Sequence, residues 1–550
     1  MEAGARLVKE RLDAEPEANL ERIENSPRWK HFGYSVLAPA VLYWKRHPSN
    51  RRYHDARMRD LAIRIGDLLA SENEKGEFTP RLDSDWDTYT WLESYRLLEA
   101  ELGRERRERW KRALLENTAR LEAGAAERLD FPWYQAPYIG TSPNHYALWA
   151  QLLYLAGRQF DRPAWVRLGS RILHRFATRE QTPDGYWGEH SPAGPTIGYD
   201  HLTLSAVAFY WEFSRDPAAM EALRRSAAFH IPFTYPDGVP VETLNNRNRY
   251  WEVPAWAQFA FTHFPQGRRY AEFLTQFFDP ARLSMGDLGR LSQDALYYHE
   301  GPAAPIPQDR ERYVHRLSVP ASIRKTGPWV VSLSGIVETP AVNNNFFLDR
   351  QANLSVFHKK LGLIVSGANS KGQPELATLR ERLGEQVFAM PLSSRLDVSE
   401  MRDRLSLAFN TFFTDLYVEP PSEKELTFRF VINGKGRPPD EAFVTLQLVM
   451  HSGETLETGA GRSFRLGMEP LELAPEAIGG SIRHHGWNLR VDPSARLKWP
   501  IFPFNPYASG PETAIEHAVG ALSVPLRLKE VPGHHVRPRE QEIAFTLSAE

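Results

Sequence analysis

The spacing of hydrophobic residues is helical over the first 300 positions of the chain. Residues 53–71, for example, place Ala62, Ile65 and Leu69 on one face and arginine and aspartate on the other, as an amphipathic helix does. The same reasoning predicts helices over residues 28–45, 53–71, 83–102, 105–125, 143–157, 163–178, 199–214, 216–230, 245–264, 266–278 and 283–298.

These helices repeat in pairs. Apolar helices rich in small residues begin near positions 28, 84, 143, 199 and 247, and a more charged helix follows each. A repeat of about 50 residues that contains two helices indicates stacked helical hairpins, with the apolar helices inside and the charged ones outside. We therefore expect an incomplete (α/α)5-6 toroid of hairpins, or an open solenoid. The inner helices would run in the same direction, so their N-termini would lie on one rim.

The pattern changes after residue 300. Residues 301–307 (GPAAPIP) read as a linker, and short β-rich segments separated by turn residues follow. This spacing favours an antiparallel β-sandwich, although residues 375–404 are mixed and could hold a short helix. The fold class is thus multidomain, α then β, with domains over residues 1–300 and 301–550. The expected strands lie at residues 329–337, 353–357, 361–366, 426–432, 442–450, 480–489 and 542–547.

Composition excludes several classes of function. The formal net charge of −2 gives no sign of a nucleic-acid partner. The absence of cysteine excludes disulfides, thiolate nucleophiles and Cys-ligated zinc. No run of about 18 apolar residues could span a membrane. Residues 1–6 lack the apolar segment of a signal peptide, so we expect a cytoplasmic protein as written, or a periplasmic or secreted one if a signal was trimmed. Nothing indicates an oligomeric state.

Two neighbouring inner helices begin with polar, titratable residues. Asn144 and His145 follow Pro143, which suits the first helical position, and Tyr199 begins the next inner helix. Each residue alone also suits a capping or packing role. Together, on one rim, Asn144, His145 and Tyr199 are our candidate catalytic residues.

Helix N-termini favour a bound anion such as a uronate carboxylate. If Asn144 holds this carboxylate in a neutralised form, the adjacent C5 proton becomes more acidic. His145 or Tyr199 could then remove that proton, and Tyr199 could protonate the leaving oxygen, because both side chains suit general acid–base catalysis. The prediction is a polysaccharide lyase that cleaves a uronic-acid-containing glycan by β-elimination.

Further residues near these helix starts are candidates for substrate contact. Aromatic residues make up 12% of the chain, and such rings stack on sugars, although large helical cores use them as well. The candidates on the rim loops and helix starts are Tyr138, Trp187, Glu189, His190, His201, Asn246, Arg247, Tyr250 and Trp251.

Two alternatives stay open. A toroidal glycoside hydrolase needs two carboxylates that flank the scissile bond, and Asp85 or Asp87 with Asp184 or Glu189 could supply them. A non-catalytic glycan-binding protein is the other alternative. The sequence of such a protein would be expected to lack the Asn-His and Tyr combination that this chain has.

The pairing of Asn144-His145 with Tyr199, 54 positions after the histidine, resembles a known group of enzymes. In polysaccharide lyases that join an α/α toroid to an antiparallel β-sandwich, the alginate lyase, oligoalginate lyase and heparinase II/III-like group, a catalytic His that often follows Asn precedes a catalytic Tyr by one hairpin. The resemblance implies this fold, an acidic polysaccharide or oligosaccharide as substrate, and no nucleic-acid or membrane partner.

One motif departs from this resemblance. Heparinase-like members carry another His at the start of a β-sandwich strand, whereas residues 349–357 here (DRQANLSVF) have Arg350 and Gln351 at that position. The third catalytic residue is then missing, replaced by Arg350, or supplied by His358; Arg350 is also a candidate substrate contact. The mechanism requires no cofactor. A structural divalent metal is conceivable but unsupported, because the β-domain histidines lack ligand-like spacing.

Overall fold

The computed structural model describes residues 1–14, 32–76, 85–131, 143–189, 194–245, 253–254, 256–279, 283–338, 346–508, 510–530 and 539–550. The chain forms two compact units. Unit 1 comprises residues 1–193, 198–231 and 253–306, and unit 2 comprises residues 194–197, 232–252 and 307–550. Whether the chain divides into independent domains at residues 300 and 301 stays a prediction. No helix in the described ranges is long and apolar enough to cross a membrane.

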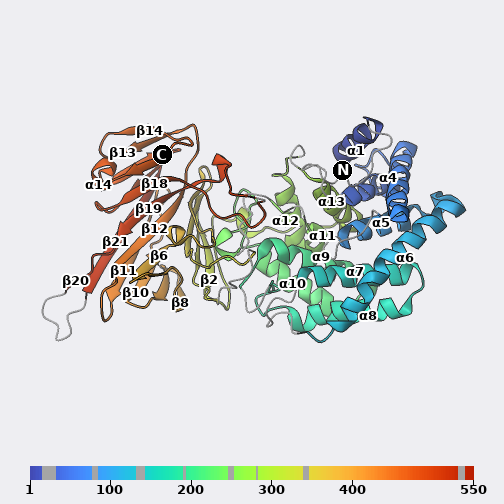
Figure 1. Cartoon of the computed structure of the whole chain (residues 1–550), viewed down its shortest axis with the longest axis horizontal. Helices are drawn as coiled ribbons and strands as arrows, with labels where there is room; N and C mark the ends of the chain where they lie inside the picture. Colours follow the sequence, from blue (N-terminus) through green and yellow to red (C-terminus); the bar gives the residue numbers. More distant parts are fainter. Residues whose placement is uncertain are drawn as a thin grey trace. The chain divides into compact units, whose positions relative to one another are not determined.

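Unit 1 is built from helices, drawn in blue to green in Figure 1. The inner helices α3, α7 and α9 bury most of their residues, whereas α6 and α8 bury one face. The elements are α1 (Glu2–Ala14), η1 (Phe32–Val36), α3 (Leu37–Trp44), α4 (Ala56–Lys75), α5 (Asp85–Leu98), η2 (Glu99–Glu101), α6 (Gly103–Glu127), α7 (Pro143–Gln159), α8 (Pro163–Arg175), η3 (Phe176–Glu180), α9 (Ile197–Ser214), α10 (Pro217–His230), α11 (Gln258–Phe261), α12 (Pro265–Thr275) and α13 (Met285–Tyr297).

The inner helices close into a ring. Tyr154 of α7 packs edge-on against Tyr210 of α9 at 5.3 Å between ring centroids, and Ser205 of α9 donates a 2.9 Å hydrogen bond to Gln293 of α13. The last helix, α13, in turn contacts α3, the first inner helix. This closure confirms the toroid and excludes the open solenoid. One inner helix of the ring, α11, is a single turn long in the described residues.

That single turn corrects the helix expected over residues 245–264. Ala257 has a left-handed backbone, with φ of 56°, directly before Gln258, and a helix cannot pass through that conformation. Residues 246–252 and 255 lie outside the described ranges, so the expected helix is not tested at those positions. Helix α1, at residues 2–14, was not expected from the sequence.

Unit 2 consists of two large antiparallel sheets whose inner faces share one hydrophobic core, which confirms the β-sandwich. The first sheet has the order β1-β2-β3-β4-β5-β12-β19-β18-β15, with β6 paired to β12 and β7 to β6. Its strands are β1 (Arg312–Arg316), β2 (Ala321–Thr326), β3 (Trp329–Ser334), β4 (Leu354–His358), β5 (Gly362–Ser366), β6 (Leu379–Leu383), β7 (Gln386–Phe388), β12 (Glu441–Val449), β15 (Leu471–Leu473), β18 (Arg496–Ile501) and β19 (Val519–Pro525).

The second sheet has the order β14-β13-β16-β17-β21-β11-β10-β9-β8, with β20 paired to β21. The region at residues 375–404 is mainly strand, and its only helical part is the short η6 (Pro374–Leu376). The strands of this sheet are β8 (Ser393–Val398), β9 (Asp403–Ala408), β10 (Phe412–Val418), β11 (Glu425–Gly434), β13 (Thr455–Thr458), β14 (Ser463–Arg465), β16 (Ser481–His484), β17 (Trp487–Arg490), β20 (Lys529–Glu530) and β21 (Arg539–Ala549). The remaining short helices of unit 2 are η4 (Glu242–Leu244), η5 (Pro307–Asp309), α14 (Pro475–Ile478) and η7 (Ile515–His517).

Segments from the first 300 residues belong to this β-rich unit. Tyr235 stacks on Phe357 with ring centroids 4.8 Å apart, and its hydroxyl lies 2.6 Å from the Ser355 hydroxyl. Buried Glu242 accepts a 2.8 Å hydrogen bond from the backbone N–H of Gly367. Burial raises the pKa of Glu242 to about 7. The chain therefore contributes to unit 2 well before the Pro-rich linker.

Close packing of α7 against α8 depends on a glycine. A Cβ at Gly169 would lie 2.7 Å from the Ala150 carbonyl oxygen and 2.9 Å from Tyr154 Cβ. Gly169→Ala should therefore destabilise the protein by about 1–3 kcal/mol, because backbone atoms cannot move aside cheaply. Gly124→Ala in α6 is the matched control, since its nearest neighbour would be 3.4 Å away.

Denaturant unfolding of the three proteins measures this difference. The control should be neutral or more stable by up to about 1 kcal/mol, as expected for Gly→Ala in a helix with space for the methyl group. Equal stability of Gly169→Ala and wild type would contradict the packing described here.

Candidate functional site

The first turn of α7 carries Asn144 and His145. Asn144 is fully buried, whereas His145 is partly exposed. The Asn144 Nδ2 group donates a short hydrogen bond to Glu189 Oε1, and Glu189 is itself 3% exposed. An ionised carboxylate only accepts hydrogen bonds, so Glu189 fixes which end of the Asn144 amide faces it. The other end, Oδ1, is buried and has no hydrogen-bond partner in the part of the chain that the structure describes.

The first turn of α9 carries Tyr199, Asp200 and His201. Tyr199 is partly exposed and packs against the helical core, whereas Asp200 and His201 point inward and are buried. Asp200 Oδ1 accepts a 2.6 Å hydrogen bond from the backbone N–H of Trp187, and Asp200 Oδ2 lies 2.5 Å from His230 Nε2. The start of α9 is thus joined to the loop that precedes it and to the end of α10.

Burial sets the protonation of this group. It raises the pKa of Asp200 well above its usual range and lowers the pKa of His230 to about 3. Both shifts favour the uncharged forms of the two side chains. Burial, with His230 beside it, also lowers the pKa of His201 well below its usual value. The neutral His201 donates from Nδ1 to the Trp256 carbonyl at 3.1 Å and packs against the His230 ring at 4.2 Å.

Residues 187–189 join the two helix starts. The backbone of Trp187 contacts Asp200 of α9, and two residues later the side chain of Glu189 contacts Asn144 of α7. Gly185 begins this loop with φ of 96°, and a Cβ there would lie 2.2 Å from the Arg225 carbonyl oxygen, so the loop needs glycine at this position. The structure therefore brings the first turns of α7 and α9 together through one short segment, although they are 54 positions apart in sequence.

Several candidate substrate-contact residues are buried and contact other groups of the protein. Trp187 is 2% exposed, and its indole N–H donates to the Phe176 carbonyl at 2.9 Å. Buried Arg350, in unit 2, pairs with Glu338 at 3.0 Å and donates to the Pro195 carbonyl at 2.9 Å. Packing and ion pairing account for these contacts, as they do for His201. Their role in substrate binding stays a prediction.

Most of the other candidate residues lie in segments that the structure does not describe. Tyr138, His190, Asn246, Arg247, Tyr250 and Trp251 lie outside the described residues. His358, the alternative third catalytic residue, is 4% exposed in β4, and its ring packs against Trp329 at 4.6 Å. Sequence reasoning missed His230, since nothing in residues 216–230 signals that the last residue of the helix contacts Asp200. The sequence pattern likewise gives no role to Asp200.

Comparisons with known proteins identify the fold. No protein-family model and no curated protein matches the sequence. Solved structures do match. A variant of the chondroitin AC lyase of Streptomyces coelicolor aligns with a TM-score of 0.50 and 12% identity, over 95% of this chain and 75% of that one. A heparinase III structure aligns with a TM-score of 0.50 and 12% identity, over 97% and 85% of the two chains. This chain therefore has a polysaccharide lyase fold, in which a helical toroid precedes antiparallel β-sheets.

The contact between Glu189 and Asn144 can be tested by stability. Glu189→Ala should lower the free energy of unfolding by about 1–3 kcal/mol, because it leaves the buried Asn144 amide without its acceptor. Glu189→Gln keeps an acceptor oxygen and should cost less. Urea unfolding measures both, with Glu108→Ala on the exposed face of α6 as the control. Equal losses for the Ala and Gln variants would contradict the hydrogen bond as the cause.

Proposed function

We propose that this chain is a polysaccharide lyase that cleaves an acidic, uronate-containing glycan by β-elimination. The observation that carries the proposal is the connection of the two helix starts through residues 187–189, which links Asn144 to the turn that carries Tyr199. The fold shared with polysaccharide lyase structures supports the same reaction class. The proposed substrate class is an acidic polysaccharide or oligosaccharide.

Asn144 receives the substrate carboxyl group in this proposal. Glu189 accepts one of the two N–H donors of the amide, and the acceptor Oδ1 has no hydrogen-bond partner among the described residues. An acceptor repels an ionised carboxylate but binds a protonated one, which donates its O–H. Asn144 therefore stabilises the uronate in its neutral acid form. Because Asn144 is fully buried, neighbouring side chains must move aside before a carboxyl group can reach it.

Neutralisation of the carboxyl group prepares the elimination. The C5–H bond becomes more acidic, and His145 or Tyr199 removes this proton as the general base. The electron pair of the C5–H bond forms the C4–C5 double bond while the C4–O bond breaks. Tyr199 protonates the departing oxygen, which completes the balance of protons. His145 and Tyr199 are both partly exposed, as groups that meet a substrate need to be.

Ultraviolet absorbance distinguishes this reaction from hydrolysis. We expect the purified chain to generate the absorbance of a C4–C5 unsaturated uronate with at least one polymer in a panel of alginate, glucuronan, heparan sulfate and chondroitin. Reducing ends should appear in step with that absorbance. Reducing ends without absorbance would establish the hydrolase instead, and neither signal with any of the four polymers would contradict the proposal.

The catalytic assignment can be tested on matched variants. Tyr199→Phe and His145→Ala should each reduce kcat by about 10²–10⁴-fold, the usual contribution of general acid–base groups. The controls are Tyr210→Phe, at the other end of α9, and His174→Ala, which is exposed on α8. Both controls should retain wild-type kcat. Circular dichroism and thermal unfolding confirm that the variants are folded, and full activity in either catalytic variant would refute its role.

A further inference from the structure

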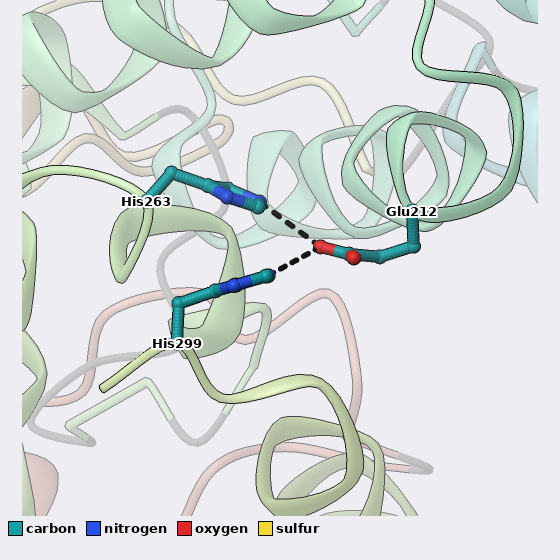
Figure 2. A group of neighbouring side chains, drawn as sticks. All are labelled: Glu212, His263 and His299. Atoms are coloured by element: carbon teal, nitrogen blue, oxygen red, sulfur yellow. Dashed lines mark hydrogen bonds and ion pairs between the residues drawn. The ribbon is translucent and has the colours of Figure 1, made fainter. Parts of the chain in front are cut away.

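Three chain segments that are distant in sequence meet at one group of side chains, Glu212, His263 and His299. Glu212 lies in the last turn of α9, His263 follows the end of α11 by two residues, and His299 follows the end of α13 by two residues. Figure 2 shows both imidazole rings pointing toward the Glu212 carboxylate. We name this group the Glu-His-His cluster. It lies entirely within unit 1.

The distances within the cluster are those of converging ligands. His299 Nε2 lies 2.7 Å and His263 Nε2 lies 3.1 Å from the same carboxylate oxygen, Oε1 of Glu212. The two rings are 4.2 Å apart at a tilt of 38°. One ligand atom from each residue lies within 4.8 Å of the other two. All three side chains therefore present a ligand atom to one small volume.

The Nε2 atoms of the two histidines differ in their hydrogen bonding. His299 Nε2 forms an aligned hydrogen bond with Glu212. His263 is 6% exposed at its side chain, and its buried Nε2 has no hydrogen-bond partner in the described ranges, although it lies beside the carboxylate. A buried imidazole nitrogen that faces a carboxylate without a hydrogen bond needs another partner, and a cation that accepts its lone pair is one.

Arg215 also lies beside the cluster. Its guanidinium is 3.5 Å from the other oxygen of Glu212, Oε2, whereas both histidines face Oε1.

We propose that Glu212, His263 and His299 form a binding site for one divalent transition-metal ion, for which Zn²⁺ is the best match. Two imidazole nitrogens and one carboxylate oxygen are a common ligand set for Zn²⁺, whereas Ca²⁺ and Mg²⁺ prefer oxygen ligands. Tetrahedral bonds of about 2.0–2.1 Å separate neighbouring ligand atoms by about 3.3 Å, so the cluster needs to open only slightly. Water completes the fourth position, since the His299 side chain is 36% exposed.

The position of the site indicates a structural role. Glu212 and Tyr199 lie near opposite ends of α9, about 20 Å apart at 1.5 Å per residue. The ion would join the ends of α9, α11 and α13, where the ring has its shortest inner helix. It therefore stabilises the toroid and takes no part in the proposed elimination. The proposed metal site does not depend on the proposed lyase function.

A second histidine group provides a contrast. In unit 2, His485 pairs with Glu454 at 2.9 Å. His484 uses both ring nitrogens, because Nδ1 donates to the Thr455 carbonyl at 2.9 Å and Nε2 accepts from the His451 backbone N–H at 2.8 Å. This group has no ligand set directed at one point, and His485→Ala is a matched control for a surface His–Glu pair.

The experiment uses the full chain, stripped with a chelator and dialysed. Titration with ZnCl₂ should give one equivalent bound by calorimetry and by metal analysis, and should raise Tm. Co²⁺ should produce the visible absorption of a low-symmetry tetrahedral ion. His299→Ala and Glu212→Gln should weaken Zn²⁺ binding by at least about 100-fold, because loss of a direct ligand exceeds the effect of an outer hydrogen-bond partner. His485→Ala should bind as wild type does.

Several outcomes would overturn the site. If the wild-type protein binds Zn²⁺, Co²⁺, Ni²⁺ and Mn²⁺ no more tightly than His299→Ala does, the Glu-His-His cluster is not a metal site. Loss of binding in His485→Ala, with binding retained in Glu212→Gln, would move the site to unit 2. Metal-free Tm and circular dichroism identify a variant that fails to fold. Two different ligand substitutions, one of them at a partly exposed residue, keep a folding defect from deciding the result.

Discussion

The candidate site depends on the anchoring of residues 187–189. A buried aspartate at the first turn of α9 receives the Trp187 N–H at 2.6 Å, and two residues later Glu189 receives the amide of Asn144. Together the two contacts link the first turns of two inner helices that are far apart in sequence. Positioning of Asn144 is thus a property of the loop as much as of its own helix.

Burial makes this anchor stable and keeps it uncharged. Asp200 and His230 are both fully enclosed, and an isolated charge on either would cost several kcal/mol. A neutral acid that shares its proton with a neutral imidazole avoids that cost and still satisfies the Trp187 N–H. The proposed proton-transfer residues beside the anchor, His145 and Tyr199, are partly exposed. Because successive side chains of a helix point about 100° apart, Tyr199 and Asp200 face different surroundings within the same turn.

Much of this architecture is readable in the sequence, because the information is local. Helix α9 was expected at residues 199–214 and occupies Ile197–Ser214, and α10 was expected at 216–230 and occupies Pro217–His230. Pro217 and the capping Asp216 mark that start unambiguously. The prediction of the fifth inner helix was wrong at Ala257, because apolar composition does not reveal a left-handed residue whose conformation depends on tertiary packing.

Strands and contacts were harder to predict for a physical reason. Strand β8 alternates between exposed and half-buried residues, so it carries almost no hydrophobic signal, and its pairing with β9 depends on a neighbour. The same limit applies to side chains. Asn144, His145 and Tyr199 are recognisable because they begin helices. Glu212, His263 and His299 lie near three separate helix ends, where no spacing links them and only closure of the ring brings them together.

Helix α9 carries residues of both proposed sites, the proton-transfer site at one end and the metal site at the other. From His201 to Tyr210 every residue is buried, so the middle of the helix has no water to hydrate an ionised group. Titratable side chains can then occur only near its ends, where loops and neighbouring helix termini supply partners. Asp200 and His201 lie at one end and Glu212 at the other, and each lies beside histidines from other segments. An inner helix with a buried middle therefore confines titratable side chains to its two ends. At one end His230 contacts buried Asp200 beside the proposed proton-transfer residues, and at the other His263 and His299 face the Glu212 carboxylate in the proposed metal site.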